Sequence, residues 1–163
     1  MATTSIDIKV MQKILQSTIT DALSTDVAED IKKIEAKQVE KLVYGVYAPV
    51  FYKRREGGGG LADVANMVTY VDNMEIAVKN ETPFNNAYDF NSPSFVPPPN
   101  SGNELAILVE GGHGSGGYIY NYPYYDEYLA PRPFTQGTIE ELKKGALKKS
   151  FIQALKRRGI DAK

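Results

Sequence analysis

The chain has 163 residues, 19 lysines and arginines against 20 aspartates and glutamates, and no cysteine. This length is typical of a single domain, so we expect one domain over residues 1–163. The formal charge of -1 gives no overall reason to expect a nucleic-acid or anionic-membrane partner. The lack of cysteine excludes disulfides, thiolate metal sites and thiol nucleophiles. No stretch approaches the roughly 18 apolar residues of a membrane span, and the first residues lack a secretory pattern, so we expect a soluble cytoplasmic product.

The N-terminal quarter is predicted to be helical, over residues 6–43. Apolar residues recur there at spacings of three and four, which is typical of one helix face: Ile8, Met11, Leu15, Ile19 and Leu23. Ser24, Thr25 and Asp26 are favourable N-cap residues, so the sequence predicts that a second helix begins at this point. That helix is expected to end near Val43.

The region 44–63 is predicted to be a loop. It holds a proline, three consecutive basic residues and the glycines 57–60, a composition that disfavours both helices and central strands. The basic residues Lys53, Arg54 and Arg55 could contact DNA phosphates, pair with a neighbouring subunit or remain solvated. We favour the subunit contact, because three charges in a nearly neutral chain are too few to indicate DNA.

Residues 64–134 are expected to hold a β-hairpin followed by loops. The runs 67–71 and 74–80 flank Asp72 and Asn73, and in the second run Met74, Ile76 and Val78 alternate with more polar positions. The proline-rich tract at 93–99 favours extended backbone. Residues 105–110 form a short apolar element that fits either a helix or a strand.

The chain is predicted to end in a helix over residues 138–159. Thr138 and Glu141 have the spacing of a capping box, Leu147, Phe151 and Leu155 form an apolar stripe, and basic residues precede Gly159. Helices, a hairpin and a final helix together predict an α+β fold, in which helices pack on a small antiparallel sheet with long extended loops.

No motif for catalysis, metal binding or cofactor binding is found. The one histidine, His113, lies in the glycine run 111–117 and has no ligand spacing around it. That run lacks the Lys-Ser/Thr pair of a phosphate-binding loop, so we interpret it as a hinge. Serines occur without a nucleophile motif. We therefore expect neither an enzyme nor a cofactor, and no catalytic or metal-binding residues.

A cluster of tyrosines follows the hinge and is the most suggestive feature for binding. Tyrosine offers a large contact area at low entropic cost. The cluster predicts a binding surface in preference to a small core, and base or sugar stacking remains an alternative. Its members are Tyr118, Tyr120, Tyr122, Tyr124, Tyr125 and Tyr128.

Several segments, in their order, resemble a family of small head-to-tail joining proteins of tailed bacteriophages. The matching positions form three groups: Tyr47, Pro49, Tyr52, Arg54, Arg55, Gly59, Gly60 and Leu61; Leu105, Ala106, Val109, Glu110 and Gly111; Pro131, Arg132, Pro133 and Phe134. The sequence departs from that pattern in its proline tract, its long tyrosine-rich loop and Pro131. Nearly the whole chain follows the plan of the family.

The resemblance implies a structural virion protein at the head–tail junction. Such a subunit would form a homo-oligomeric ring, hexameric or dodecameric, between portal or head-completion proteins and the tail tube or tail terminator. Genomic DNA would pass through the lumen without specific recognition, and the protein would occupy the host cytoplasm during assembly. Arg132 would fix the junction before the last helix by pairing with a carboxylate such as Glu110. The interface candidates are Tyr52, Lys53, Arg54, Arg55, Tyr118, Tyr120, Tyr122, Tyr124, Tyr125, Arg132 and Phe134.

Two other readings stay open. The chain could be a tail terminator or a minor capsid protein on a similar plan. Alternatively, it could be a monomeric module that binds a glycan or peptide with the tyrosine-rich loop. The oligomeric mass of the purified protein discriminates between a ring and a monomer.

Overall fold

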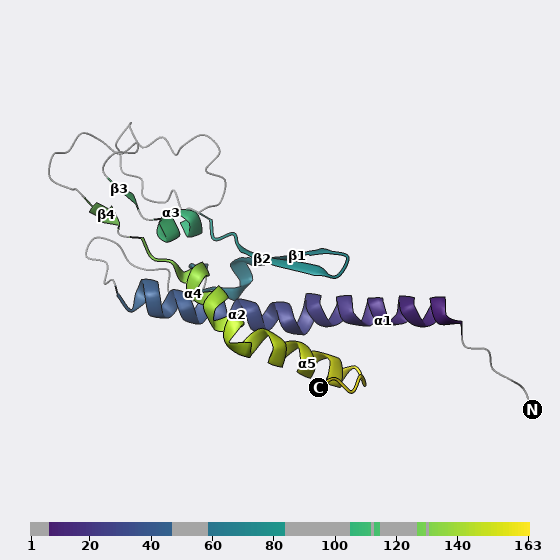
Figure 1. Ribbon diagram of the computed structural model, residues 1–163. Helices are drawn as coiled ribbons and strands as arrows, with labels where there is room; N and C mark the ends of the chain where they lie inside the picture. Colours follow the sequence, from purple (N-terminus) through teal and green to yellow (C-terminus); the bar gives the residue numbers. More distant parts are fainter. Residues whose placement is uncertain (1–6, 47–58, 84–104, 112, 115–126, 130) are drawn as a thin grey trace, which may run out of the picture.

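The structure is a computed structural model that describes residues 7–46, 59–83, 105–111, 113–114, 127–129 and 131–163. A long helical rod dominates it (Figure 1). The rod consists of α1 (Ile8–Ala22), a π-helical turn (Leu23–Val27), α2 (Ala28–Val39) and a second π-helical turn (Glu40–Tyr44). Asp7 caps its start, since its side chain accepts a hydrogen bond from the amide of Lys9.

The predicted break between two N-terminal helices is wrong. Residues 23–27 continue the helix as a π turn, in which the amide of Ala28 donates to the carbonyl of Leu23, five residues back. The hydroxyls of Ser24 and Thr25 donate to the carbonyl of Asp21, three and four residues back, instead of capping a new helix. The rod therefore runs without interruption past the point where the sequence suggests a stop.

The predicted hairpin is confirmed. Strands β1 (Met67–Asp72) and β2 (Glu75–Asn80) pair antiparallel, with Met67 opposite Asn80 and Asp72 opposite Glu75. The turn lies one residue later than expected, because Asn73 has a positive φ of 53° and Met74 belongs to the turn. Ile76 and Val78 are half-buried between exposed neighbours, as the alternation predicts. A short 3-10 turn (Val64–Asn66) precedes β1.

The remaining elements cover one end of the rod and one of its sides. The ambiguous segment is a helix, α3 (Leu105–Gly111), and β3 (His113–Gly114) pairs antiparallel with β4 (Glu127–Leu129). The C-terminal helix begins at Phe134, earlier than predicted, as α4 (Phe134–Glu141). A π turn (Leu142–Ala146), bent at Gly145 with a φ of 109°, leads into α5 (Leu147–Arg157).

The predicted capping box at Thr138 is also wrong. Thr138 lies inside α4, is buried, and donates its hydroxyl to the carbonyl of Phe134 one turn back. The cap of α4 comes from outside the helix and is described below. Thr138 thus adds a buried polar contact within the helix and does not mark its start.

Two hydrophobic clusters hold the elements on the rod. The first joins α2 and its π turn to α3 and α4 through Val39, Val43, Leu61, Ala106, Val109 and Phe134. The second joins α1 and its π turn to α5 through Ala22, Val27, Ala154 and Leu155, with Ile76 of the hairpin packed against it. The chain therefore has the predicted α+β fold. Its core is spread along the C-terminal two thirds of the rod.

Candidate subunit interface

Most of the predicted interface residues lie outside the described residues. This holds for Tyr52, Lys53, Arg54 and Arg55, and for the tyrosines of the cluster between positions 118 and 125. Arg132 and Phe134 are described, and the structure places both at the junction that precedes α4.

Phe134 is a core residue, and its selection as an interface candidate is wrong. Its side chain is 1% exposed and packs in the first hydrophobic cluster. A phenyl ring buried in this way holds the subunit together and presents no surface to a neighbour. A sequence motif alone does not distinguish these two uses of an aromatic side chain.

Arg132 connects the start of α4 to α3 and to the end of the rod. Its backbone amide donates to the carbonyl of Val109 on α3 at 3.1 Å, and its guanidinium donates to the carbonyl of Val43 at the end of the rod at 3.3 Å. The carbonyls near a helix end lack partners within the helix, so the contact with Val43 satisfies one of them. Arg132 is half-buried, which fits a positioning residue better than a contact surface.

Glu110 has a different role at the same junction from the one that was predicted. Its carboxylate oxygens accept hydrogen bonds from the amide of Thr135, at 3.0 and 3.2 Å, and one of them accepts from the amide of Gln136 at 3.4 Å. These amides are in the first turn of α4, where a negative charge is stabilised by the helix dipole. The expected partner was the guanidinium of Arg132, and no Arg132–Glu110 ion pair occurs among the described residues.

A buried polar network ties residues 59–63 to the rod. The side-chain amide of Asn80 donates to the carboxylate of Glu35 at 3.1 Å and to the carbonyl of Leu61 at 2.8 Å. The side-chain oxygen of Asn80, Oδ1, in turn accepts hydrogen bonds from the backbone amide and the hydroxyl of Thr82. Burial raises the pKa of Glu35, against the opposing effect of the hydrogen bond from Asn80. The network places residues 59–63 beside α2 and β2.

A charged cluster joins the C-terminal end of α5 to the rod. The guanidinium of Arg158 donates to Asp26, to Asp21 at 2.7 Å and to the hydroxyl of Thr25 at 2.7 Å. The hydrogen bond from Arg158 is the largest of the effects that lower the pKa of Asp26. A hydrogen bond from Arg157 lowers this pKa further. Thr25 and Asp26, which were expected to cap a helix, therefore bind an arginine more than a hundred residues away, together with Asp21.

The clearest unpartnered surface is on the N-terminal half of α1. Figure 1 shows this half running beyond the tip of the hairpin and beyond the end of α5. Its apolar side chains are about half or more exposed, up to 70% for Ile8 and 62% for Ile14. We call this the α1 stripe, and it consists of Ile8, Val10, Met11, Ile14 and Leu15.

The α1 stripe continues a face that is buried farther along the same helix. Ile8, Met11 and Leu15 are in line with Ile19 and Ala22, at spacings of three and four residues. Ile19 and Ala22 pack against α5 in the second hydrophobic cluster. The face that is apolar along the whole of α1 is thus covered over only its C-terminal part.

The hairpin carries a second exposed apolar surface. Val68 and Tyr70 point to its outer face, away from the side that Met67 and Asn80 bury, and Tyr70 is 50% exposed. Val71 and Met74 are exposed at its distal end. Together the α1 stripe and the hairpin hold nine of the twelve large hydrophobic residues that are exposed in the described part of the chain.

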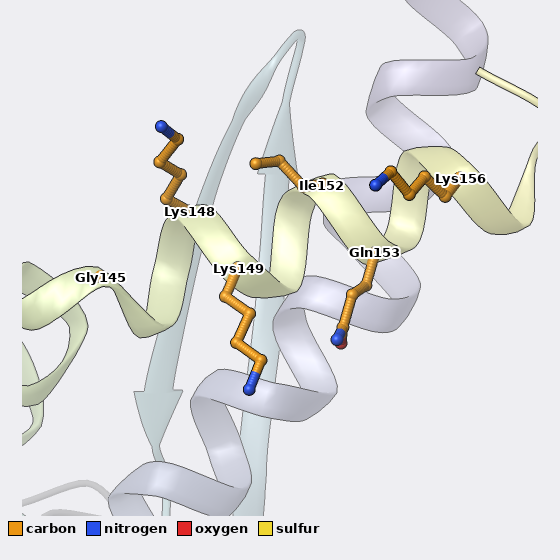
Figure 2. A pocket seen from close by; sticks show the side chains of 6 residues that line it. All are labelled: Gly145, Lys148, Lys149, Ile152, Gln153 and Lys156. Atoms are coloured by element: carbon orange, nitrogen blue, oxygen red, sulfur yellow. The ribbon is translucent and has the colours of Figure 1, made fainter. Parts of the chain in front are cut away.

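A shallow groove lies on the surface of α5 (Figure 2). Lys148, Lys149 and Lys156 project from the helix around Ile152, and Gly145 lies at one end. The groove is open and lies on a single helix. Such a shape does not enclose a small molecule in the way that a substrate pocket does.

In the described ranges, no three His, Asp or Glu side chains gather closely enough to hold a metal ion. No helix in those ranges has the length and apolar character needed to cross a membrane.

Comparison with known proteins shows that the chain is similar to a prophage-derived protein. A sequence model of the YomN family matches residues 7–157. The SPbeta prophage-derived protein YomN of Bacillus subtilis (strain 168) is 28% identical over 162 residues, which cover 98% of each chain. No solved structure shows significant similarity.

Proposed function

This chain belongs to the YomN family, a phage-derived protein family, and we propose that it is a structural protein of a tailed-bacteriophage virion. In this proposal it is the subunit of a homo-oligomeric ring at the head–tail junction, where it connects portal or head-completion proteins to the tail. It has no catalytic role. It assembles from the host cytoplasm, and genomic DNA passes through the ring without specific recognition.

The observation that carries the proposal is the exposed apolar surface on α1 and the hairpin. Five large hydrophobic side chains are about half or more exposed on a helix segment that no other described element covers. A helix of this length gains most of its stability from packing of its apolar face. Contiguous exposed apolar surface of this kind is typical of a protein that works bound to other proteins.

The junction before α4 adds support from the motifs that carry the resemblance to head–tail joining proteins. Residues 105–111 and 131–134, far apart in the sequence, are in direct contact: Arg132 donates to Val109, Glu110 caps α4, and Phe134 packs with Ala106. Their joint occurrence thus has a structural reason, because the two segments build one junction. A protein that carries both motifs can build the same junction, which supports a common subunit plan.

Native mass spectrometry of the full chain tests the proposal. The purified protein is measured alone, then after mixing with heads and with tails from a phage that lacks the gene. A closed ring in solution, or a monomer that becomes a ring only on heads or tails, supports the head–tail role. A chain that stays monomeric and binds to neither particle contradicts it and favours the monomeric binding module.

A further inference from the structure

We propose that one face of α5 contacts the phosphate backbone of double-stranded DNA without reading its sequence. The inference rests on the proposed ring, in which it supplies the contact with the genomic DNA that passes through the lumen. We call this surface the α5 lysine face, and its members are Lys148, Lys149, Ile152, Gln153 and Lys156. They recur at spacings of three and four residues, so they share one side of the helix (Figure 2).

Positive charge is concentrated in this part of the chain. Residues 142–160 hold seven of the 19 lysines and arginines and none of the 20 aspartates and glutamates, which leaves 12 basic and 20 acidic residues elsewhere. The rest of the chain therefore has a formal charge of -8. A polyanion is repelled by the rest of the chain and attracted by this segment, so the field of the whole molecule turns the α5 lysine face toward DNA.

The three lysines of the face carry charges that the subunit does not neutralise. Lys148, Lys149 and Lys156 are exposed, and none of them forms an ion pair with another described residue. The two arginines that follow are different, because Arg157 and Arg158 both pair with Asp26. The arginines thus hold α5 on the rod, and the lysines are left for a partner.

The packing of α5 fixes the direction in which these lysines face. On the opposite side of the helix, the hydroxyl of Ser150 donates to the carboxylate of Asp30 on α2 at 2.6 Å. Ala154, one turn later, packs in the second hydrophobic cluster. Because this side of α5 is buried against the rod, the α5 lysine face is directed outward from the subunit.

The residue types of the face favour DNA over an acidic protein. Lysine is depleted in protein–protein interfaces, which are enriched in aromatic, methionine and arginine side chains. The face has no aromatic residue, and its single apolar side chain, Ile152, is half-buried. A lysine ammonium contacts phosphate as a point charge on a flexible stem. Contacts of this kind carry no sequence information and allow DNA to slide along the protein.

The same face is unsuited to an anionic membrane. A helix that lies on a lipid surface buries a broad apolar face among the lipids. The apolar side of α5 is already used inside the subunit, where Phe151, Ala154 and Leu155 belong to the second hydrophobic cluster. A soluble polyanion therefore fits the exposed side better than a bilayer does.

Chromatography of the full chain on immobilised double-stranded DNA tests the inference. The test variant combines Lys148→Gln, Lys149→Gln and Lys156→Gln, which removes three charges and keeps residues that favour a helix. The matched control combines Lys33→Gln, Lys37→Gln and Lys41→Gln, three exposed lysines at spacings of four on the rod.

The control lysines differ from the α5 lysine face in their surroundings. Glu29 is four residues before Lys33, and Glu40 is three residues after Lys37, so exposed carboxylates lie beside them on the helix. Both triple variants lose the same net charge. A difference between them therefore reports the position of the lysines and not the charge of the whole chain.

The wild-type chain is expected to bind the DNA column at low salt and to elute in a salt gradient. The α5 variant should appear in the flow-through, and the control variant should elute close to the wild type. Three results would overturn the inference: no retention of the wild type, an equal loss in both variants, or stronger retention on immobilised polyglutamate of the same charge density, which indicates an acidic protein partner. If the wild type forms rings on heads or tails but is not retained on DNA, the proposed function stands and only this contact is wrong.

Discussion

The carboxylate of Glu35 on α2 accepts a hydrogen bond of 3.1 Å from the side-chain amide of Asn80 at the end of β2, and both side chains are buried. This pair links the rod to the hairpin and, through the contact of Asn80 with Leu61, to residues 59–63. A buried carboxylate is costly when it is charged. The link is therefore sensitive to pH.

The stability of the fold is expected to fall as pH rises through the range in which Glu35 titrates. Burial raises its pKa in the folded state, so the folded chain keeps this proton at pH values where the unfolded chain has lost it. Glu35→Gln keeps an acceptor for Asn80 and removes the charge. The variant should be more stable than the wild type at neutral pH and should lose this part of the pH dependence, measured by urea unfolding at a series of pH values. An unchanged pH profile in Glu35→Gln would show that Glu35 does not titrate in this range.

Arg158→Gln is expected to destabilise the fold by about 1–3 kcal/mol, because Asp21 and Asp26 lose a hydrogen-bonded cation. Arg157→Gln is the matched control. Its side chain is 68% exposed, against 18% for Arg158, so its loss should cost at most about 1 kcal/mol. Chemical unfolding of the two variants at neutral pH checks the difference, and equal effects would contradict it.

The same cluster predicts a loss of stability in acid. The hydrogen bond from Arg158 lowers the pKa of Asp26 in the folded state. This ion pair therefore stabilises the fold fully at pH values above the ordinary aspartate pKa. It disappears as pH falls through the lowered value. In Arg158→Gln this part of the acid sensitivity should be reduced, which unfolding curves at acidic pH would reveal.

Gly145→Ala is expected to destabilise the fold by about 1–2 kcal/mol, although a Cβ there would meet open space. The cause is the backbone, since Gly145 has a φ of 109° at the bend between α4 and α5. Gly111→Ala is the control, because a Cβ also fits there and its backbone has no positive φ. Thermal unfolding should separate the two, and a neutral Gly145→Ala would contradict the role of the bend.

Glu110→Ala should cost about 1 kcal/mol through loss of the cap on α4. Glu140→Ala, on the exposed surface of α4, removes a carboxylate of the same helix without touching its first amides and should have a smaller effect. Urea unfolding of the two variants measures the difference. A cap that contributes nothing would leave them equal.

The sequence predicts those elements whose pattern is local. The spacing of Ile8, Met11, Leu15 and Ile19 correctly indicates a helix, and the alternation at Ile76 and Val78 correctly indicates a strand. The errors arise where a residue far away in the sequence determines the role of a side chain. Asp26 resembles an N-cap in sequence, but the structure uses it to bind Arg158 from the far end of the chain.

The exposed apolar surface could be predicted only in part, for a similar reason. The apolar stripe on α1 is visible in the sequence. The sequence does not show, however, that α5 covers Ile19 and leaves Leu15 exposed. Conversely, Phe134 belongs to a recognisable motif and turns out to be core, because α2 and α3 close around it. Exposure depends on the length of neighbouring elements, which local pattern does not encode.

Electron microscopy of lysates from a phage that carries an in-frame deletion of the gene tests the central claim most directly. If the chain is a subunit of the head–tail junction, the lysate should contain DNA-filled heads and complete tails that are not joined. Supplying the wild-type chain from a plasmid should restore joined, infectious particles. Joined and infectious particles in the deletion lysate itself would contradict the account.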